Sequence, residues 1–259
     1  MKLALIGNGA ISQYVQLSLA AQDIPVSAFV LRSKSEAQVS GVPICLSVEE
    51  LPADITHIVD CAGHQGLTQH GPSALRRGLD VITVSIGALA DQHLSDELKN
   101  AAVAGNSRLH LASGAIGALD ALRAAKCGKL DRVCYVGRKP PKGWLGSPAE
   151  EKLDLNGQLK QAQTHFTGSA REAALRYPKN ANVAAAVALA GLGFDKTGVE
   201  LIADPNVNSN IHELHALGDF GNFEFRISGN SLPDNPRSSA LAAMSVVASI
   251  LETQRPIRS

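Results

Sequence analysis

Aromatic side chains and net charge are both scarce in this sequence. Phe, Trp and Tyr make up 4% of the 259 residues, and Lys plus Arg equal Asp plus Glu at 24 each. Proteins that bind nucleic acids usually carry a basic surface, and those that hold single strands also offer aromatic rings on which bases stack. The sequence therefore argues against a nucleic-acid-binding protein.

Cysteine pairs are also missing. The four cysteines are Cys45, Cys61, Cys127 and Cys134, and no two of them form a CxxC pair. This spacing predicts neither a disulfide framework nor a zinc site. Reduced thiols are typical of a cytoplasmic protein, which is the location we expect.

Long hydrophobic runs are absent as well. The apolar stretches near Val183–Leu192 and Ala240–Ile250 are shorter than the ~20 residues that cross a bilayer as a helix. The first predicted strand begins at Lys2 and leaves no space for a signal peptide. We therefore expect no membrane association.

The first 113 residues alternate between strand and helix patterns. Strands are predicted at Lys2–Ile6, Val26–Leu31, Ile55–Cys61, Asp80–Val84 and Arg108–Ala112, with helices between them that include His64–Arg77 and Asp91–Ala104. Such alternation is typical of an α/β domain with a doubly wound parallel sheet of the Rossmann type. Ligands of these sheets bind beyond the carboxyl ends of the strands.

A glycine turn follows the first predicted strand. Gly7 permits the tight turn, and Gly9 lets the backbone approach a pyrophosphate. The helix that begins at Ala10 and Ile11 directs its N-terminal N–H groups at the same phosphates. Ser12 replaces the third glycine of the usual pattern but is small enough for close packing. Gly7, Gly9, Ala10 and Ile11 are therefore predicted to bind a dinucleotide.

The end of the second strand bears on the choice of cofactor. An acidic residue there usually binds the ribose 2′-hydroxyl of NAD. This chain instead has Arg32 and Ser33, followed by Lys34 and Ser35, which suit the 2′-phosphate of NADP. The pattern favours NADP competence and leaves NAD or NADP as the cofactor.

The pattern changes after residue 113. Helices are predicted at Ala115–Lys126, Pro148–Gln161, Ser169–Arg176 and Val183–Ala190, and strands at Leu130–Val136, Val199–Ala203, Ser209–Leu217 and Asn222–Ser228. This order indicates a second, α+β domain over residues 114–236, with a mostly antiparallel sheet. The stretch Asn230–Pro236 is interpreted as a linker. We expect the last helix, within residues 237–259, to return to the first domain.

His212 is the candidate catalytic residue. In an extended chain it shares one side with Asn206, Asn208 and Asn210, whereas His215 has the opposite parity. The two histidines are therefore not expected to bind one metal ion, and no metal site is predicted. A histidine in a cleft can move a proton near neutral pH.

Four segments resemble the L-aspartate dehydrogenase family. They are the GNGAI segment at residues 7–11, SGAIGALD at 113–120, PKNANVA at 178–184 and NSNIHE at 208–213. The resemblance covers essentially the whole chain. It implies NAD(P)-dependent oxidation of L-aspartate to iminosuccinate, with reductive amination of oxaloacetate as the reverse reaction and NAD biosynthesis as the use. It also implies that Ala115 and Asn182 contact the cofactor and that His212 is the acid/base.

Two alternatives remain open. The chain could reduce another amino or oxo dicarboxylate, because fold-level similarity does not select the substrate. It could also be a sensor that binds NAD(P) without turnover.

A dicarboxylate substrate needs cationic or amide partners, for which Arg138, Lys139 and Arg171 are the candidates. Asn182 also precedes an apolar helix and is predicted to cap it. We expect a homo-oligomer, a dimer.

Overall fold

The structure is a computed structural model that describes all residues except 34–40, 158, 179, 234 and 258–259, and except the side chains of 236 and 237. Two compact units divide the chain. Unit 1 comprises Met1–Ala112 and Ala242–Ser259, and unit 2 comprises Ser113–Leu241. The second boundary falls five residues after the one expected at 236, because residues 235–239 form a strand rather than a linker.

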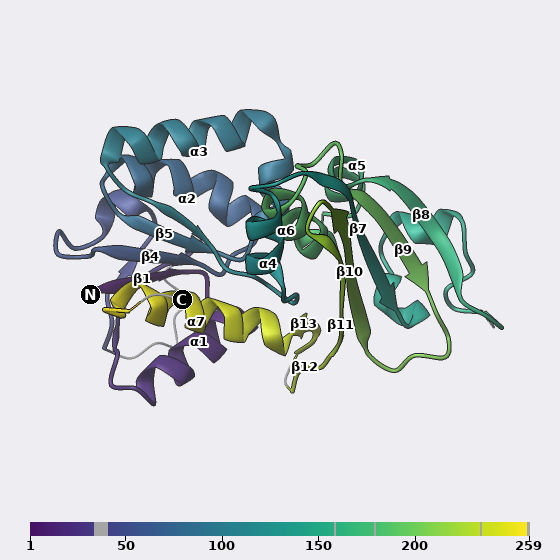
Figure 1. Cartoon of the computed structure of the whole chain (residues 1–259). Coiled ribbons are helices and arrows are strands. Elements are labelled where there is room, and N and C mark those ends of the chain that lie inside the picture. Colours follow the sequence, from purple (N-terminus) through teal and green to yellow (C-terminus); the bar gives the residue numbers. More distant parts are fainter. Residues whose placement is uncertain (34–40, 158, 179, 234, 258–259) are drawn as a thin grey trace. The chain divides into compact units, whose positions relative to one another are not determined.

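Unit 1 contains a six-stranded sheet in the order β3-β2-β1-β4-β5-β6 (Figure 1). Its strands are β1 (Leu3–Ile6), β2 (Val26–Val30), β3 (Ile44–Cys45), β4 (His57–Asp60), β5 (Asp80–Thr83) and β6 (Leu109–Leu111). Every neighbouring pair is parallel. This confirms the doubly wound sheet, whose central strand β1 is apolar throughout because both of its faces are covered.

Helices cover both faces of this sheet (Figure 1). They are α1 (Ala10–Ala20), α2 (His64–Arg76), α3 (Gln92–Gly105) and α7 (Ala240–Gln254). The side chains of Val246 and Ile250 on α7 are fully buried with Val15 and Leu19 of α1 in one core cluster. The C-terminal helix therefore belongs to the core of unit 1, although unit 2 separates it from the rest of that unit in the sequence.

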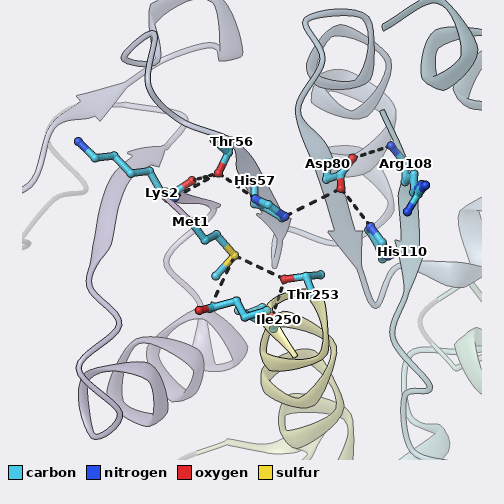
Figure 2. A network of polar contacts seen from close by, with 10 residues as sticks. Met1, Lys2, Thr56, His57, Asp80, Arg108, His110, Ile250 and Thr253 are labelled. Carbon is cyan, nitrogen blue, oxygen red and sulfur yellow. Dashed lines mark hydrogen bonds and ion pairs between the residues drawn. The ribbon is translucent and has the colours of Figure 1, made fainter. Parts of the chain in front are cut away.

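A polar network lies at the amino-terminal ends of the strands of this sheet (Figure 2). Asp80, at the start of β5, accepts a hydrogen bond from the backbone N–H of Arg108 at 2.7 Å and lies 3.4 Å from His110 Nε2 and 3.9 Å from His57 Nε2. These contacts join the beginnings of β4, β5 and the segment before β6. Because the strands are parallel and the glycine turn follows the carboxyl end of β1, this network lies at the opposite ends of the strands from the turn. Its residues therefore do not contribute to a site at the glycine turn.

Unit 2 contains a five-stranded sheet in the order β11-β10-β7-β9-β8. Its elements are α4 (Leu119–Ala125), β7 (Leu130–Lys139), β8 (Gln163–Ser169), α5 (Ala170–Arg176), α6 (Asn182–Ala190), β9 (Gly198–Ala203), β10 (Asn210–Gly218) and β11 (Gly221–Gly229). Only β7 and β9 pair in parallel, so the sheet is mostly antiparallel, as expected. A small hairpin of β12 (Ser231–Leu232) and β13 (Asn235–Ser239) follows.

Four local features differ from the expectations drawn from the sequence. The helix expected at Pro148–Gln161 is a short 3-10 helix, Pro148–Glu151, because Asp154 accepts the backbone N–H of Gly157 in a turn. Strand β8 follows that turn and was not predicted. The helix expected from Ala115 begins at Leu119, because Ala118 has a left-handed backbone with φ of 58°. Residues 231, 232, 235 and 236 of the expected linker at 230–236 belong to the hairpin, and residue 234 lies outside the described residues.

Candidate active site

The glycine turn of unit 1 has the geometry of a phosphate cradle. Gly7 has a φ of 86°, and a Cβ there would approach Ala62 Cβ to 3.1 Å. A Cβ at Gly9 would meet nothing within 4 Å, so the space beside it is open. No side chain among the described residues caps α1, which leaves its first N–H groups, from Ala10 and Ile11 onward, for a ligand. The turn therefore fits a pyrophosphate.

A cleft of about 480 Å³ adjoins this turn. It is lined by the glycine turn, by Leu31 and Arg32 directly after β2, by Ala62 in the β4–α2 connection, and by Gln65 and His70 on α2. Arg32 is exposed, and its guanidinium donates a long, 3.4 Å hydrogen bond to Gln65. Arg32 therefore lines the cleft that adjoins the glycine turn. Ser33 follows it, whereas Lys34 and Ser35 lie outside the described residues.

A buried carboxyl group shapes the wall of this cleft. Asp60, at the end of β4, accepts hydrogen bonds from the Thr83 hydroxyl at 2.8 Å, the Ser85 hydroxyl at 2.5 Å and the backbone N–H of Ala62 at 3.0 Å. Burial raises its pKa, and these hydrogen bonds act in the opposite direction. The carboxyl end of β4 is thereby tied to that of β5, which fixes the loop against which Gly7 packs.

His212 lies on β10 in unit 2 and is buried. Its Nδ1 lies 2.7 Å from the hydroxyl of Tyr135 on β7, which is also buried. His212 pairs across the sheet with Gly137, and Tyr135 is two residues from Gly137 on the same face. A Cβ at position 137 would lie 2.7 Å from the Tyr135 hydroxyl, so glycine leaves the space that this contact requires.

The contact with Tyr135 engages one of the two ring nitrogens of His212. Burial raises the pKa of the Tyr135 phenol, so its hydroxyl stays protonated at neutral pH. With Nδ1 engaged, Nε2 has no hydrogen-bond partner among the described residues. Burial and the nearby Lys139 ammonium lower the pKa of His212 to about 4. The His212 imidazole is therefore neutral near pH 7, and the described residues leave its Nε2 without a hydrogen bond.

The three candidate cations differ in their partners. Arg138 donates to the Asp204 carboxylate at 2.8 Å, and Arg171 donates to both oxygens of Asp195 at 2.6 and 2.9 Å. Lys139 forms no ion pair with a carboxylate of the described residues, and its ammonium donates to the side-chain oxygen of Asn180 at 2.6 Å. Burial lowers the pKa of Lys139 to about 8. Two of the three cations are thus neutralised within the protein.

Ala115 and Asn182 also lie in unit 2. Ala115 is buried in the turn before α4, and Asn182 is the first residue of α6. The prediction that Asn182 caps this helix was wrong, because Ala181 occupies the capping position without a side-chain hydrogen bond. The Asn182 side chain is therefore not committed to that cap.

No cluster of three metal-ligating side chains occurs within the part of the chain that the structure describes. His212 and His215 point to opposite faces of β10, as the strand parity predicted, and His215 lies near the carboxylates of Glu213 and Glu224. The two histidines therefore do not share a metal site.

Comparison with known sequences and structures shows what the chain resembles. Residues 120–253 match the family described as aspartate dehydrogenase, C-terminal, and residues 7–112 match the NAD binding domain of homoserine dehydrogenase. The L-aspartate dehydrogenase of Ruegeria pomeroyi is 52% identical, with 100% of this chain and 94% of that protein covered. The chain belongs to the L-aspartate dehydrogenase family. It is therefore a dehydrogenase that uses a pyridine nucleotide.

Other family members agree over the same span. The L-aspartate dehydrogenase of Pseudomonas aeruginosa is 46% identical, with 96% of each chain covered. The crystal structure of aspartate dehydrogenase from Thermotoga maritima superposes with a TM-score of 0.77 at 28% identity, over 100% of this chain and 97% of that one. These findings confirm the resemblance inferred from the four sequence segments and the fold class expected from it.

The sequence did not reveal the contact of Tyr135 with His212 or the hydrogen bond between Lys139 and Asn180. Strand parity was the signal available, because Tyr135, Gly137 and Lys139 are two residues apart on one strand and therefore share a face. Parity alone does not say which face of β7 meets His212, since that depends on the β7–β10 register. Asn180 belongs to a turn, so no periodicity pointed to it.

Proposed function

We propose that the chain oxidises L-aspartate to iminosuccinate with NAD or NADP, and that the reverse reaction aminates oxaloacetate with ammonia. The use proposed for iminosuccinate is NAD biosynthesis. The observation that best supports this reaction is the contact between Tyr135 and His212, which holds the imidazole through Nδ1 and leaves Nε2 available to the substrate amine. It lies in a chain whose full-length relatives are named L-aspartate dehydrogenase.

His212 acts as the proton acceptor in this proposal. Aspartate enters with an ammonium group, and its amine must lose a proton before the α-carbon can give up hydride. In the tautomer whose Nδ1–H donates to the Tyr135 hydroxyl oxygen, Nε2 is unprotonated and accepts that proton directly or through one water molecule. The lowered pKa of His212 keeps the imidazole neutral near pH 7, and substrate carboxylates beside it would raise that pKa towards the working range. Tyr135 keeps the ring oriented while the proton moves.

The cofactor supplies the hydride acceptor when it is bound. The proposed contacts with its phosphates and adenosine are those of Gly7, Gly9, Ala10, Ile11, Arg32 and Ser33. The open cradle at Gly9 and the uncapped start of α1 support the phosphate contacts. Ala115 and Asn182 remain predicted cofactor contacts.

Following nicotinamide absorbance with L-aspartate, in NAD and NADP separately, tests the activity. We expect His212→Ala to lower kcat by roughly 10²–10⁴-fold, the usual contribution of general acid–base catalysis. His215→Ala is the matched control, because His215 lies three residues away on the other face of β10 and should leave kcat unchanged. Near-normal turnover by folded His212→Ala protein would remove His212 from the mechanism.

The same assay separates the alternatives. Turnover of another dicarboxylate in preference to aspartate would indicate a different reductase, and cofactor binding without turnover would indicate a sensor.

No helix that the described residues form is long and apolar enough to cross a membrane. We also propose a cytoplasmic location and a homodimer, and analytical ultracentrifugation of the purified chain tests the second point.

A further inference from the structure

Lys139 is a half-buried cation of unit 2 that has no carboxylate partner among the described residues. It ends β7 on the same face as Tyr135 and Gly137, and Gly137 pairs with His212. Lys139 lies two residues from Gly137, which corresponds to roughly 7 Å along the strand. The ammonium also acts electrostatically on His212 and contributes to its lowered pKa. The cation and the proposed base therefore belong to one surface.

The Lys139 side chain is held in place without being neutralised. Asn180 accepts one hydrogen bond, and the ammonium lies 4.8 Å from the centre of the Trp144 ring, which attracts cations. Trp144 is itself fully buried and fixed by a 2.9 Å hydrogen bond from its Nε1 to the Ile202 carbonyl. An ammonium group has three N–H donors. Asn180 uses one of them, so donors remain for a further partner.

Desolvation of the Lys139 ammonium is costly in the folded protein. Burial lowers the pKa of Lys139 to about 8, which records a charge that the folded protein does not compensate. Arg138 and Arg171 lack this property, because each is paired with a carboxylate of the chain. An uncompensated, partly buried cation beside a proton acceptor is the arrangement that an anionic substrate needs.

We propose that the Lys139 ammonium binds a carboxylate of the dicarboxylate substrate, and that Asn180 positions it for this contact. The proposal rests on the proposed function, since it assigns a subsite of that reaction. Asn180 acts through Lys139 and is a positioning residue. The same contact selects for substrates that carry the second carboxylate if it is the side-chain carboxylate that Lys139 binds.

The decisive variant is Lys139→Met, which keeps the length of the side chain and removes its charge. We expect KM for L-aspartate to rise by roughly 10–100-fold, the range for a lost hydrogen bond to a charged group, with a smaller change in kcat. Lys139→Arg should recover part of this loss. Lys142→Met is the matched control, because Lys142 is an exposed lysine three residues away.

Two ligands identify the carboxylate. L-2-Aminobutyrate keeps the α-carboxylate of aspartate and replaces the side-chain carboxylate with a methyl group. If Lys139 binds the side-chain carboxylate, Lys139→Met raises the KM for aspartate and leaves the KM for aminobutyrate unchanged. If Lys139 binds the α-carboxylate, the substitution raises both KM values by the same factor. Asn180→Ala should raise the aspartate KM in wild type and have little further effect in Lys139→Met.

Calorimetric titration of the full chain with succinate, in the presence of saturating NAD, provides a readout without turnover. We expect Lys139→Met to weaken succinate binding as it weakens aspartate. If wild type binds succinate through Lys139 but oxidises no aspartate, the proposed function fails and the anion subsite stands. The subsite proposal fails if succinate affinity and aspartate KM are unchanged in Lys139→Met. It also fails if kcat falls with KM unchanged, since Lys139 would then act as an acid or base.

Discussion

Replacing Tyr135 with Phe tests whether the orientation of His212 depends on a single hydroxyl group. The substitution removes one oxygen, which lies 2.7 Å from Nδ1 of a buried imidazole, and keeps the ring. The two rings are nearly parallel, with an angle of 20° and centres 6.0 Å apart, so their packing should survive. The effect on activity should then come from the lost hydrogen bond.

The magnitude follows from the burial of both partners. Nδ1 would lose its partner in a position where water has little access, which costs roughly 1–3 kcal/mol in folding free energy. Once the ring can rotate, Nε2 no longer points at one fixed place. If the transition state loses the same roughly 1–3 kcal/mol of stabilisation, kcat falls by roughly 5–150-fold. The KM for aspartate should change less, because Tyr135 is not proposed to bind a carboxylate.

Steady-state kinetics of Tyr135→Phe, His212→Ala and the double variant provide the assay. Because Tyr135 acts through His212, its substitution should have almost no further effect on kcat once His212 is Ala. Urea unfolding of each variant separates loss of stability from loss of activity. Equal falls in kcat from Tyr135→Phe in the presence and in the absence of His212 would refute the positioning role.

Three further outcomes test other parts of the molecule. Arg32→Ala should raise the Kd for NADP more than that for NAD, as measured by fluorescence titration at fixed salt, and equal effects would show that Arg32 does not bind the 2′-phosphate. Asn182→Asp should fold normally yet bind NAD(P) more weakly, and an unchanged cofactor Kd would exclude the predicted contact. Acid should destabilise the fold through His165, whose Nε2 is buried without a partner among the described residues and whose pKa burial lowers to about 4. The unfolded state binds the proton first, near the ordinary His value of about 6.5, so the free energy of unfolding should fall as the pH drops from 6.5 to 4, by about 2 kcal/mol at pH 5. His165→Gln should lack this component in urea unfolding at pH 7.5 and 5, and an identical pH dependence in wild type and variant would contradict the assignment.

Most of unit 1 could be predicted from the sequence. The strands there are short apolar runs bounded by turn residues, and helical patterns separate them, so local signals determine the order of the elements. The glycine turn after β1 could be recognised from its own residues, because the φ of 86° at Gly7 is a backbone conformation that favours glycine. Strand parity also placed His212 and His215 on opposite faces correctly.

Local signals were weaker in unit 2. The stretch Pro148–Gln161 contains enough helix-forming residues to suggest a helix, but the turn at Asp154–Gly157 ends it early. Strand β8 pairs with β9, more than 30 residues later in the chain, and such pairing is decided by packing rather than by propensity. The start of α4 depended on one left-handed residue, Ala118, which no sequence rule for alanine predicts.

The sequence alone determined the parallel sheet of unit 1 and the glycine turn at Gly7 and Gly9, and it identified His212 as the candidate for proton transfer. Only the tertiary structure decided which groups surround His212. The β7–β10 register places Tyr135 against Nδ1 and puts Lys139 on the same face, and the turn before α6 supplies Asn180. Contacts between residues 41 to 77 positions apart depend on strand register and on burial, and neither is encoded within a local window of sequence.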